Sequence, residues 1–245
     1  MARANRHYIP GCVWHITHRC HKQEFLLKFS KDRQRWRDWL FEAKKRFGLS
    51  VLNYVVTSNH IHLLVVDTRK DVISKSIQLI AGRTAQEFNQ RKSRKGAFWE
   101  NRYHAVAVER GKYLTNCLVY IDLNMVRAGV VRYPSEWPFG GYNEIQNPAK
   151  RYSVIDQKAL LSTCGAIDPE QFRYDYRHWV EAAVNNHQVI KQPAWSESIA
   201  IGGKGFVEEI RGKLGTKAMG RKVIGNDENY TLIRTSNSLL YSFDI

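Results

Sequence analysis

The first 130 residues alternate between two hydrophobic periods, one typical of strands and one typical of helices. Residues 13–18, Val-Trp-His-Ile-Thr-His, alternate apolar and polar positions and include β-branched residues, which predicts a strand. Further strands are predicted over residues 51–57, 61–66 and 104–108. The run at 61–66 is almost continuously apolar, as in a strand at the centre of a sheet.

Apolar residues at helical spacing lie between and after these strands. They predict helices over residues 30–47, 71–90 and 112–128, and the first and third are each followed by a glycine. The resulting order is β-α-β-β-α-β-α. We therefore expect an α+β protein with a ferredoxin-like β-α-β-β-α-β core, an antiparallel-containing sheet, and a third helix that carries Tyr120.

The composition changes near residue 148, where a polar stretch at 143–151 follows the last motif of the first part. We expect one domain at residues 1–148 and a mostly helical accessory region at 149–245. Asp168-Pro169 is a typical helix start within the second part.

Charge separates the two parts more clearly. The chain has 38 Lys and Arg against 23 Asp and Glu, a net charge of +15 and a sequence pI near 9.8. Residues 1–150 hold 26 basic and 12 acidic residues, a net charge of +14, whereas residues 151–245 hold 12 and 11, a net charge of +1. This excess points to a polyanionic partner, a nucleic acid, that meets the first part of the chain.

Composition also excludes several classes of protein. No apolar run approaches the roughly 18 residues of a membrane helix, and residues 1–6 lack the apolar stretch of a signal peptide. We expect no membrane partner and a cytoplasmic, nucleoid-associated protein. The four cysteines fall at irregular spacings, so reduced thiols are expected rather than a disulfide framework or a zinc knuckle.

Two histidines mark the first candidate site. His60 and His62 are two residues apart in a predicted strand, so both side chains point to one face, about 6.5 to 7 Å apart along the chain. Two imidazoles in this arrangement can converge on one metal ion. Taken alone, the pair can equally well fill a half-buried face of a sheet.

The second candidate site lies on the third predicted helix, where Tyr120 and Asn124 are neighbours at i and i+4. The phenol could attack a phosphate while the amide binds a metal, or the ring could simply be buried. Tyr113, one heptad earlier, is a rival nucleophile. Trp99, Arg102 and Tyr103 offer planar groups that can stack on unpaired bases, or an aromatic hinge packed on the sheet.

Four motifs, at residues 59–65, 98–105, 120–129 and 137–142, together resemble the REP-associated tyrosine transposases of the HUH superfamily, whose domain is the IS200-like transposase domain. The resemblance spans roughly residues 5 to 145. Two departures are visible, because Ser58 and Met125 stand where the family has proline.

The resemblance implies a metal-dependent endonuclease and strand-transferase that cuts single-stranded DNA at hairpin-bearing repeats. His60, His62 and Asn124 would hold Mg²⁺ or Mn²⁺, and Tyr120 would form a 5′-phosphotyrosine intermediate in DNA transposition and recombination. Arg127, with Trp99, Arg102 and Tyr103, would contact the DNA. Two alternatives are a DNA- or RNA-binding regulator without catalysis and a hydrolase that uses water; a homodimer is also left open.

Overall fold

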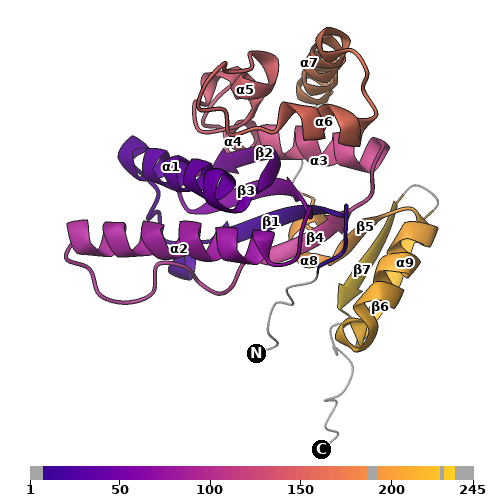
Figure 1. Cartoon of the computed structure of the whole chain (residues 1–245), viewed down its shortest axis with the longest axis horizontal. Helices are drawn as coiled ribbons and strands as arrows, with labels where there is room; N and C mark the ends of the chain where they lie inside the picture. Colours follow the sequence, from indigo (N-terminus) through magenta and orange to yellow (C-terminus); the bar gives the residue numbers. More distant parts are fainter. Residues whose placement is uncertain (1–7, 187–191, 227–228, 235–245) are drawn as a thin grey trace, which may run out of the picture.

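A sheet of seven strands runs through the described residues, 8–186, 192–226 and 229–234, of this computed structural model (Figure 1). Its strand order is β2-β3-β1-β4-β5-β7-β6. The pairs among the first four are antiparallel, β4 and β5 are parallel, and the last pairs are antiparallel again. The strands are β1 (Val13–Arg19), β2 (Ser50–Val56), β3 (His60–Val66), β4 (His104–Val108), β5 (Ala200–Gly202), β6 (Arg221–Asn226) and β7 (Asn229–Arg234).

The order of elements confirms the expected α+β fold with a ferredoxin-like core. The helices of the first part are α1 (Ser30–Phe47), α2 (Val72–Arg91), α3 (Lys112–Asp122), α4 (Asn124–Arg127) and α5 (Tyr142–Gln146). Those of the second are α6 (Gln157–Cys164), α7 (Pro169–Asn185), α8 (Ala194–Glu197) and α9 (Lys204–Leu214). Two 3₁₀ turns, His21–Gln23 and Pro134–Glu136, lie in the first part and one, Gly215–Ala218, lies in the second. No helix within the described ranges is long and apolar enough to cross a membrane.

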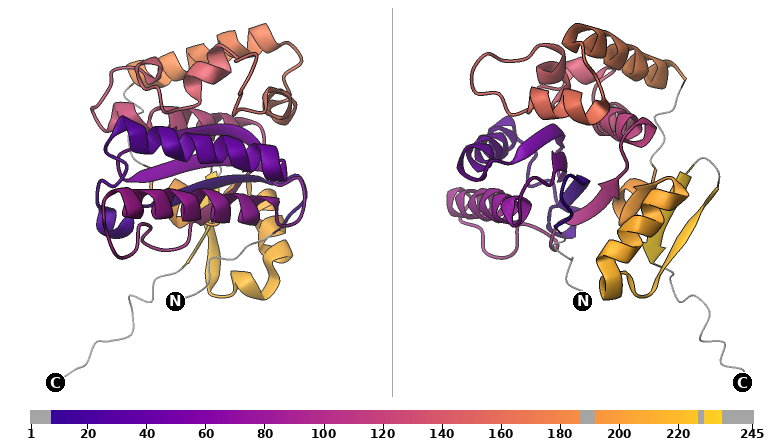
Figure 2. Two further views of the ribbon diagram at one scale, coloured as in Figure 1. Left: turned by 60° about the vertical axis from the view of Figure 1, so that its left-hand side comes forward. Right: turned by 45° about the vertical axis from the view of Figure 1, so that its right-hand side comes forward.

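The two faces of the sheet carry different helices. Helices α1 and α2 lie side by side on one face and α3 lies on the other (Figure 2). The pairing register places Thr17 opposite His62 and Arg19 opposite His60, and paired residues in an antiparallel sheet share a face. His60 and His62 therefore lie on the α3 face, while Trp14 and Ile16 pack into the core beneath α1 and α2.

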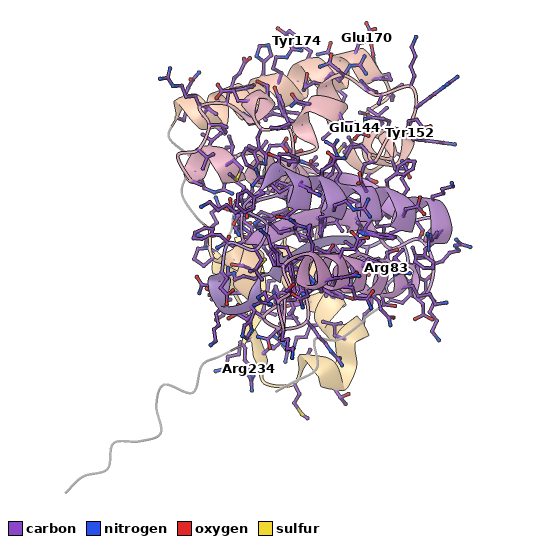
Figure 3. The ribbon with its side chains drawn as sticks, turned by 90° about the vertical axis from the view of Figure 1, so that its left-hand side faces the viewer. Arg83, Glu144, Tyr152, Glu170, Tyr174 and Arg234 are labelled. Carbon is purple, nitrogen blue, oxygen red and sulfur yellow. The ribbon has the colours of Figure 1, made fainter. Side chains whose placement is uncertain are left out.

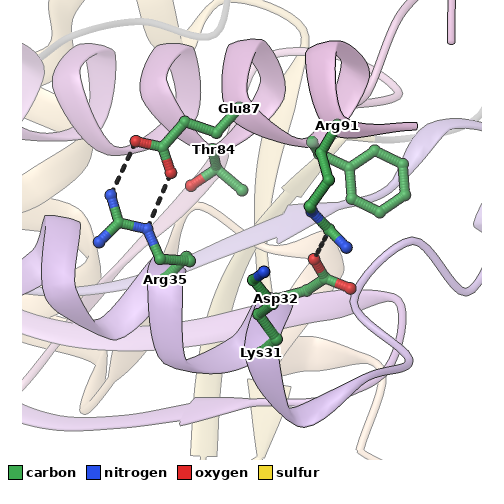
Figure 4. A pocket seen from close by; sticks show the side chains of 7 residues that line it. Lys31, Asp32, Arg35, Thr84, Glu87 and Arg91 are labelled. Carbon is green, nitrogen blue, oxygen red and sulfur yellow. Dashed lines mark hydrogen bonds and ion pairs between the residues drawn. The ribbon is translucent and has the colours of Figure 1, made fainter. Parts of the chain in front are cut away.

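Ion pairs join the helices of the outer layer. Figure 3 looks onto this layer, with Arg83 marking α2 and Tyr174 marking α7 at the edge of the molecule. Arg35 of α1 donates two hydrogen bonds, of 2.9 and 2.8 Å, to Glu87 of α2, and Arg91 pairs with Asp32 (Figure 4). The exposed Arg35–Glu87 pair adds little stability, because solvent screens it.

The third helix is shorter than its hydrophobic period predicts. Backbone geometry changes at Leu123 (φ −75°, ψ 2°), so that α3 ends at Asp122 and a short helix, α4, begins at Asn124. The break occurs although Met125 occupies the place of the family's proline. Gly129, with a φ of +67°, closes the segment in the left-handed conformation that glycine adopts without strain.

The second part of the chain continues the fold of the first. Its helix α7 begins as predicted, because the Asp168 side chain accepts hydrogen bonds from the backbone N–H groups of Glu170 and Gln171. The sequence did not indicate β5, β6 and β7, which extend the sheet beyond β4. The division near residue 148 stays a prediction.

Candidate active site

The two histidines of the first motif meet at the end of β3. Their ring centroids are 5.0 Å apart and the rings are nearly perpendicular, at 81°. Nδ1 of His60 lies 2.7 Å from Oδ1 of Asn59 and 3.0 Å from Oγ1 of Thr57. These contacts orient the His60 ring, so that Nε2 is the nitrogen that would bind a metal.

A third histidine, His15 of β1, contacts His62. Its Nε2 lies 2.9 Å from Nδ1 of His62, and the two rings are stacked at 5.0 Å with an angle of 8°. Burial lowers the pKa of His15 to about 3 and that of His62 well below its ordinary value, and the charge of His60 lowers the latter further. Both rings are therefore neutral near pH 7, as metal ligation requires of His62.

Tyr120 faces the histidines from α3. Its ring centroid is 5.8 Å from that of His62, and the ring is 8% exposed. The guanidinium of Arg127 lies 4.0 Å from the ring centroid, and its Nη2 donates a hydrogen bond of 2.7 Å to the Tyr120 carbonyl. Burial raises the pKa of the Tyr120 phenol, and the charge of Arg127 opposes that rise.

An open cavity of about 630 Å³ joins these groups. His60, His62, Tyr120 and Asn124 all line it. Its wall is mostly polar and carries three arginines; the further lining residues include Arg19, Arg102, Arg127, His104, Gln23, Asn59, Ser196 and Glu197. This volume lies within the usual range of ligand-binding cavities.

The donor set fits a divalent metal ion. The imidazoles of His60 and His62 and the amide oxygen of Asn124 would offer three ligands, and the open cavity leaves positions for water or a phosphate oxygen. The described residues contain no group of three or more His, Cys, Asp or Glu side chains that could hold a metal. Asn124, which lines the cavity with both histidines, would be the third ligand, as the family resemblance implies.

The other predicted residues divide between the cavity and the core. Arg102 and Arg127 line the cavity. Trp99 packs on the opposite side of β1, where it stacks on His18 at 4.1 Å and donates its indole N–H to the Ala81 carbonyl at 3.0 Å. Tyr103 also packs against the core, as the hinge interpretation expects. The rival nucleophile Tyr113 is buried and is not among the residues that line the cavity.

The sequence did not indicate two residues beside this site, His15 and Trp195, and a third, His104, was interpreted as a structural histidine of its strand. His15 lies on the same face of β1 as Thr17, so its alternation was a usable signal. His104 donates its Nε2–H to the Ser198 carbonyl at 2.7 Å on the cavity wall. Trp195 of α8 covers Tyr120, with ring centroids 5.7 Å apart, and no local pattern indicated it.

Residues 8–124 match the family model described as "Transposase IS200 like". This part of the chain is similar to the IS200-like transposases. This match supports a transposase function, and therefore an enzyme, for the part that contains His60, His62, Tyr120 and Asn124. No curated protein matches the chain.

Two solved structures are similar to parts of this chain. A REP-associated tyrosine transposase bound to a REP hairpin has 22% sequence identity and a TM-score of 0.50, over 62% of this chain and 90% of that chain. At this identity the likeness shows the fold alone. A putative transposase from Deinococcus radiodurans R1 has 16% identity and a TM-score of 0.35, over 53% of this chain and 92% of that chain, which supports no argument.

Proposed function

We propose that the IS200-like domain cuts and rejoins single-stranded DNA through a covalent bond between Tyr120 and the 5′ phosphate of the cut strand. The observation that carries this proposal is the convergence of four side chains on one cavity. His60, His62, Tyr120 and Asn124 come from three elements, β3, α3 and α4, and all four line the same wall. A protein that only binds nucleic acid has no need of this set.

His60, His62 and Asn124 would hold Mg²⁺ or Mn²⁺, which when bound supplies a Lewis acid for the scissile phosphate. The remaining chemistry belongs to the side chains themselves. The oxygen of Tyr120 forms a bond to phosphorus and the bond to the 3′ oxygen breaks. The proton lost by the phenol ends on the released 3′ hydroxyl. Because a phosphodiester is exchanged for a phosphotyrosine bond, a 3′ hydroxyl can reverse the reaction without a nucleotide cofactor.

Arg127 prepares Tyr120 for this attack. A phenol with a pKa near 10 is a weak nucleophile at neutral pH, and burial raises the pKa of Tyr120 further. The guanidinium on the ring favours the phenolate and holds the ring in place through its hydrogen bond to the Tyr120 carbonyl. Trp195, on the ring at 5.7 Å, keeps water from one side of it.

The substrate follows from charge and from the relative of known structure. Residues 1–150 carry a net charge of +14, which suits a polyanion. The similar REP-associated tyrosine transposase is bound to a REP hairpin. We therefore propose a hairpin flanked by single-stranded DNA as the substrate of this domain.

The test is an incubation of the full chain with labelled hairpin DNA and Mn²⁺, followed by a denaturing protein gel. We expect a labelled protein band that depends on Tyr120 and on the metal. Cleavage without a labelled band would point to a hydrolase that uses water. Binding without cleavage, across a set of hairpins and metals, would favour a regulator that has lost the chemistry.

A further inference from the structure

Two phenylalanines are exposed beside the active-site cavity. Phe25 is 66% exposed and Phe29 is 56% exposed, although the two residues next to Phe25 on its C-terminal side, Leu26 and Leu27, are buried. The backbone between the rings is held in place. Leu27 donates its N–H to the Ser58 carbonyl at 2.9 Å, and Arg33 donates to the carbonyls of Leu27 and Lys28 at 2.9 and 2.7 Å.

Basic residues of the loop after α2 lie against this segment. The ammonium of Lys92 lies 5.3 Å from the centroid of the Phe29 ring, and Arg94 pairs with Glu24 at 3.4 Å. Arg91 pairs with Asp32 across the α1–α2 boundary (Figure 4). The contacts of Lys92 and Arg94 place residues 22–31 and 91–95 side by side, and we call these two segments together the Phe25–Lys95 surface.

The Phe25–Lys95 surface has the composition of a site for a single strand. Its two segments hold seven basic residues and one acidic residue, Glu24. Exposed rings that alternate with cations suit an unpaired strand, because unpaired bases stack on the rings while the phosphates meet the cations. A duplex hides the faces of its bases and cannot use the rings.

The surface is continuous with the active-site cavity. Gln23 lines the cavity and stands two residues before Phe25. The Gln23 carbonyl accepts a hydrogen bond of 3.2 Å from the side chain of Asn59, which also contacts His60. A strand that lies in the cavity therefore meets this surface directly beyond the histidine pair.

We propose that the Phe25–Lys95 surface binds the unpaired DNA next to the scissile phosphate, with bases stacked on Phe25 and Phe29 and phosphates held by Lys28, Lys31 and Lys92. The identity of the ligand as DNA rests on the proposed function. The stacking role rests on the exposed rings and on the charge around them.

The test measures binding separately from cleavage. Every variant carries Tyr120→Phe, and the fluorescence anisotropy of a labelled 20-nucleotide single strand and of the matching duplex is titrated. Phe25→Ala with Phe29→Ala should weaken single-strand binding about tenfold or more and duplex binding less than about twofold. Tyrosine at both positions should retain the affinity, whereas leucine should not. Tyr174→Ala is the matched control, since Tyr174 is a 58% exposed ring on the distant helix α7 (Figure 3).

Salt titrations separate stacking from charge. The alanine pair should leave the slope of log affinity against log salt unchanged, whereas Lys28→Gln with Lys31→Gln should reduce it by about 1.4. Unchanged single-strand affinity in the alanine pair, or an equal loss for duplex, would overturn the proposal. So would a change in oligomeric mass with unchanged DNA affinity, because the rings would then contact a second copy. The adduct assay of the wild type decides the proposed function independently of these affinities.

Discussion

Nε2 of His15 lies 2.9 Å from Nδ1 of His62, with the two rings stacked at 5.0 Å. If His62 held the proposed metal through Nε2, its Nδ1–H would donate a hydrogen bond to Nε2 of His15. His15 is fully buried, whereas His62 also lines the open cavity. His15 is in this way a positioning residue for the proposed ligand His62.

His15→Ala should therefore weaken metal binding by about 10- to 100-fold, the usual cost of losing a partner behind a metal ligand. Titration calorimetry with Mn²⁺ measures this without any cleavage. His178→Ala, which removes an exposed histidine from α7, should leave the affinity unchanged. Equal Mn²⁺ affinity in His15→Ala and the wild type would show that His62 does not depend on His15.

Tyr120→Phe should abolish the covalent protein–DNA band, because it removes the attacking oxygen and nothing else. The ring keeps its contacts with Arg127 and Trp195, so the free energy of unfolding should change by less than about 1 kcal/mol. Tyr113→Phe is the matched control and should form the band normally. A band formed by Tyr120→Phe but lost in Tyr113→Phe would move the nucleophile to Tyr113.

His60→Ala or His62→Ala should lower cleavage by orders of magnitude at a fixed metal concentration, since the two imidazoles set the position of the ion. Asn124→Ala should lower cleavage less than either histidine variant does, because water can replace a neutral amide ligand. Chelation of the metal should stop cleavage while DNA binding persists. Cleavage by His62→Ala that equals the wild type throughout a Mn²⁺ titration would exclude this metal site.

Acid should destabilise the fold through His18. Burial lowers its pKa to about 4, against about 6.5 in an unfolded chain. The unfolded chain therefore binds more protons between these values. The stabilisation is complete above pH 6.5 and is lost as the pH falls towards 4, by about 3 kcal/mol.

Replacement of His18 by Gln should flatten this dependence by up to about 1.4 kcal/mol per pH unit. Urea unfolding at several pH values between 4.5 and 7.5 measures the slope for both proteins. The slope is informative even if the variant is less stable throughout, since Gln does not titrate. Parallel slopes would show that His18 does not titrate with a lowered pKa.

A hydrogen bond from Tyr176 of α7 connects the second part of the chain to α3, the helix that carries Tyr120. The Tyr176 hydroxyl donates to the carboxyl of Asp122, which also accepts a hydrogen bond of 2.9 Å from Asn53. All three side chains are buried. Tyr176→Phe should lower the free energy of unfolding by about 1–3 kcal/mol, because it leaves a buried acceptor without one donor.

Urea unfolding checks this value, with Tyr174→Phe, an exposed tyrosine of the same helix, as the control. A change below about 0.5 kcal/mol would mean that water replaces the hydroxyl. The same contacts make the full chain the proper material for DNA-binding experiments, since removal of residues 151–245 takes away Tyr176 and Trp195 together.

The sequence by itself determined the features that depend on local period. Alternation along a strand placed His60 and His62 on one face, and helical spacing predicted α1, α2 and most of α3. The helix cap at Asp168 also depends only on neighbouring residues, because its acceptor and its two donors lie within three residues of one another. Four motifs in order were enough to indicate the family.

Only the tertiary structure decided which of these residues meet. His15 and His62 are 47 residues apart in the chain, and Trp195 reaches Tyr120 from the second part, so no local pattern could pair them. The same holds for β5, whose three residues gain their strand character from pairing with β4 and β7. The contact of the Trp99 ring with His18 is also set by packing between residues far apart in the chain. The hydrophobic period of the sequence indicates on which face of an element a side chain lies. Long-range packing decides which residues lie opposite that face.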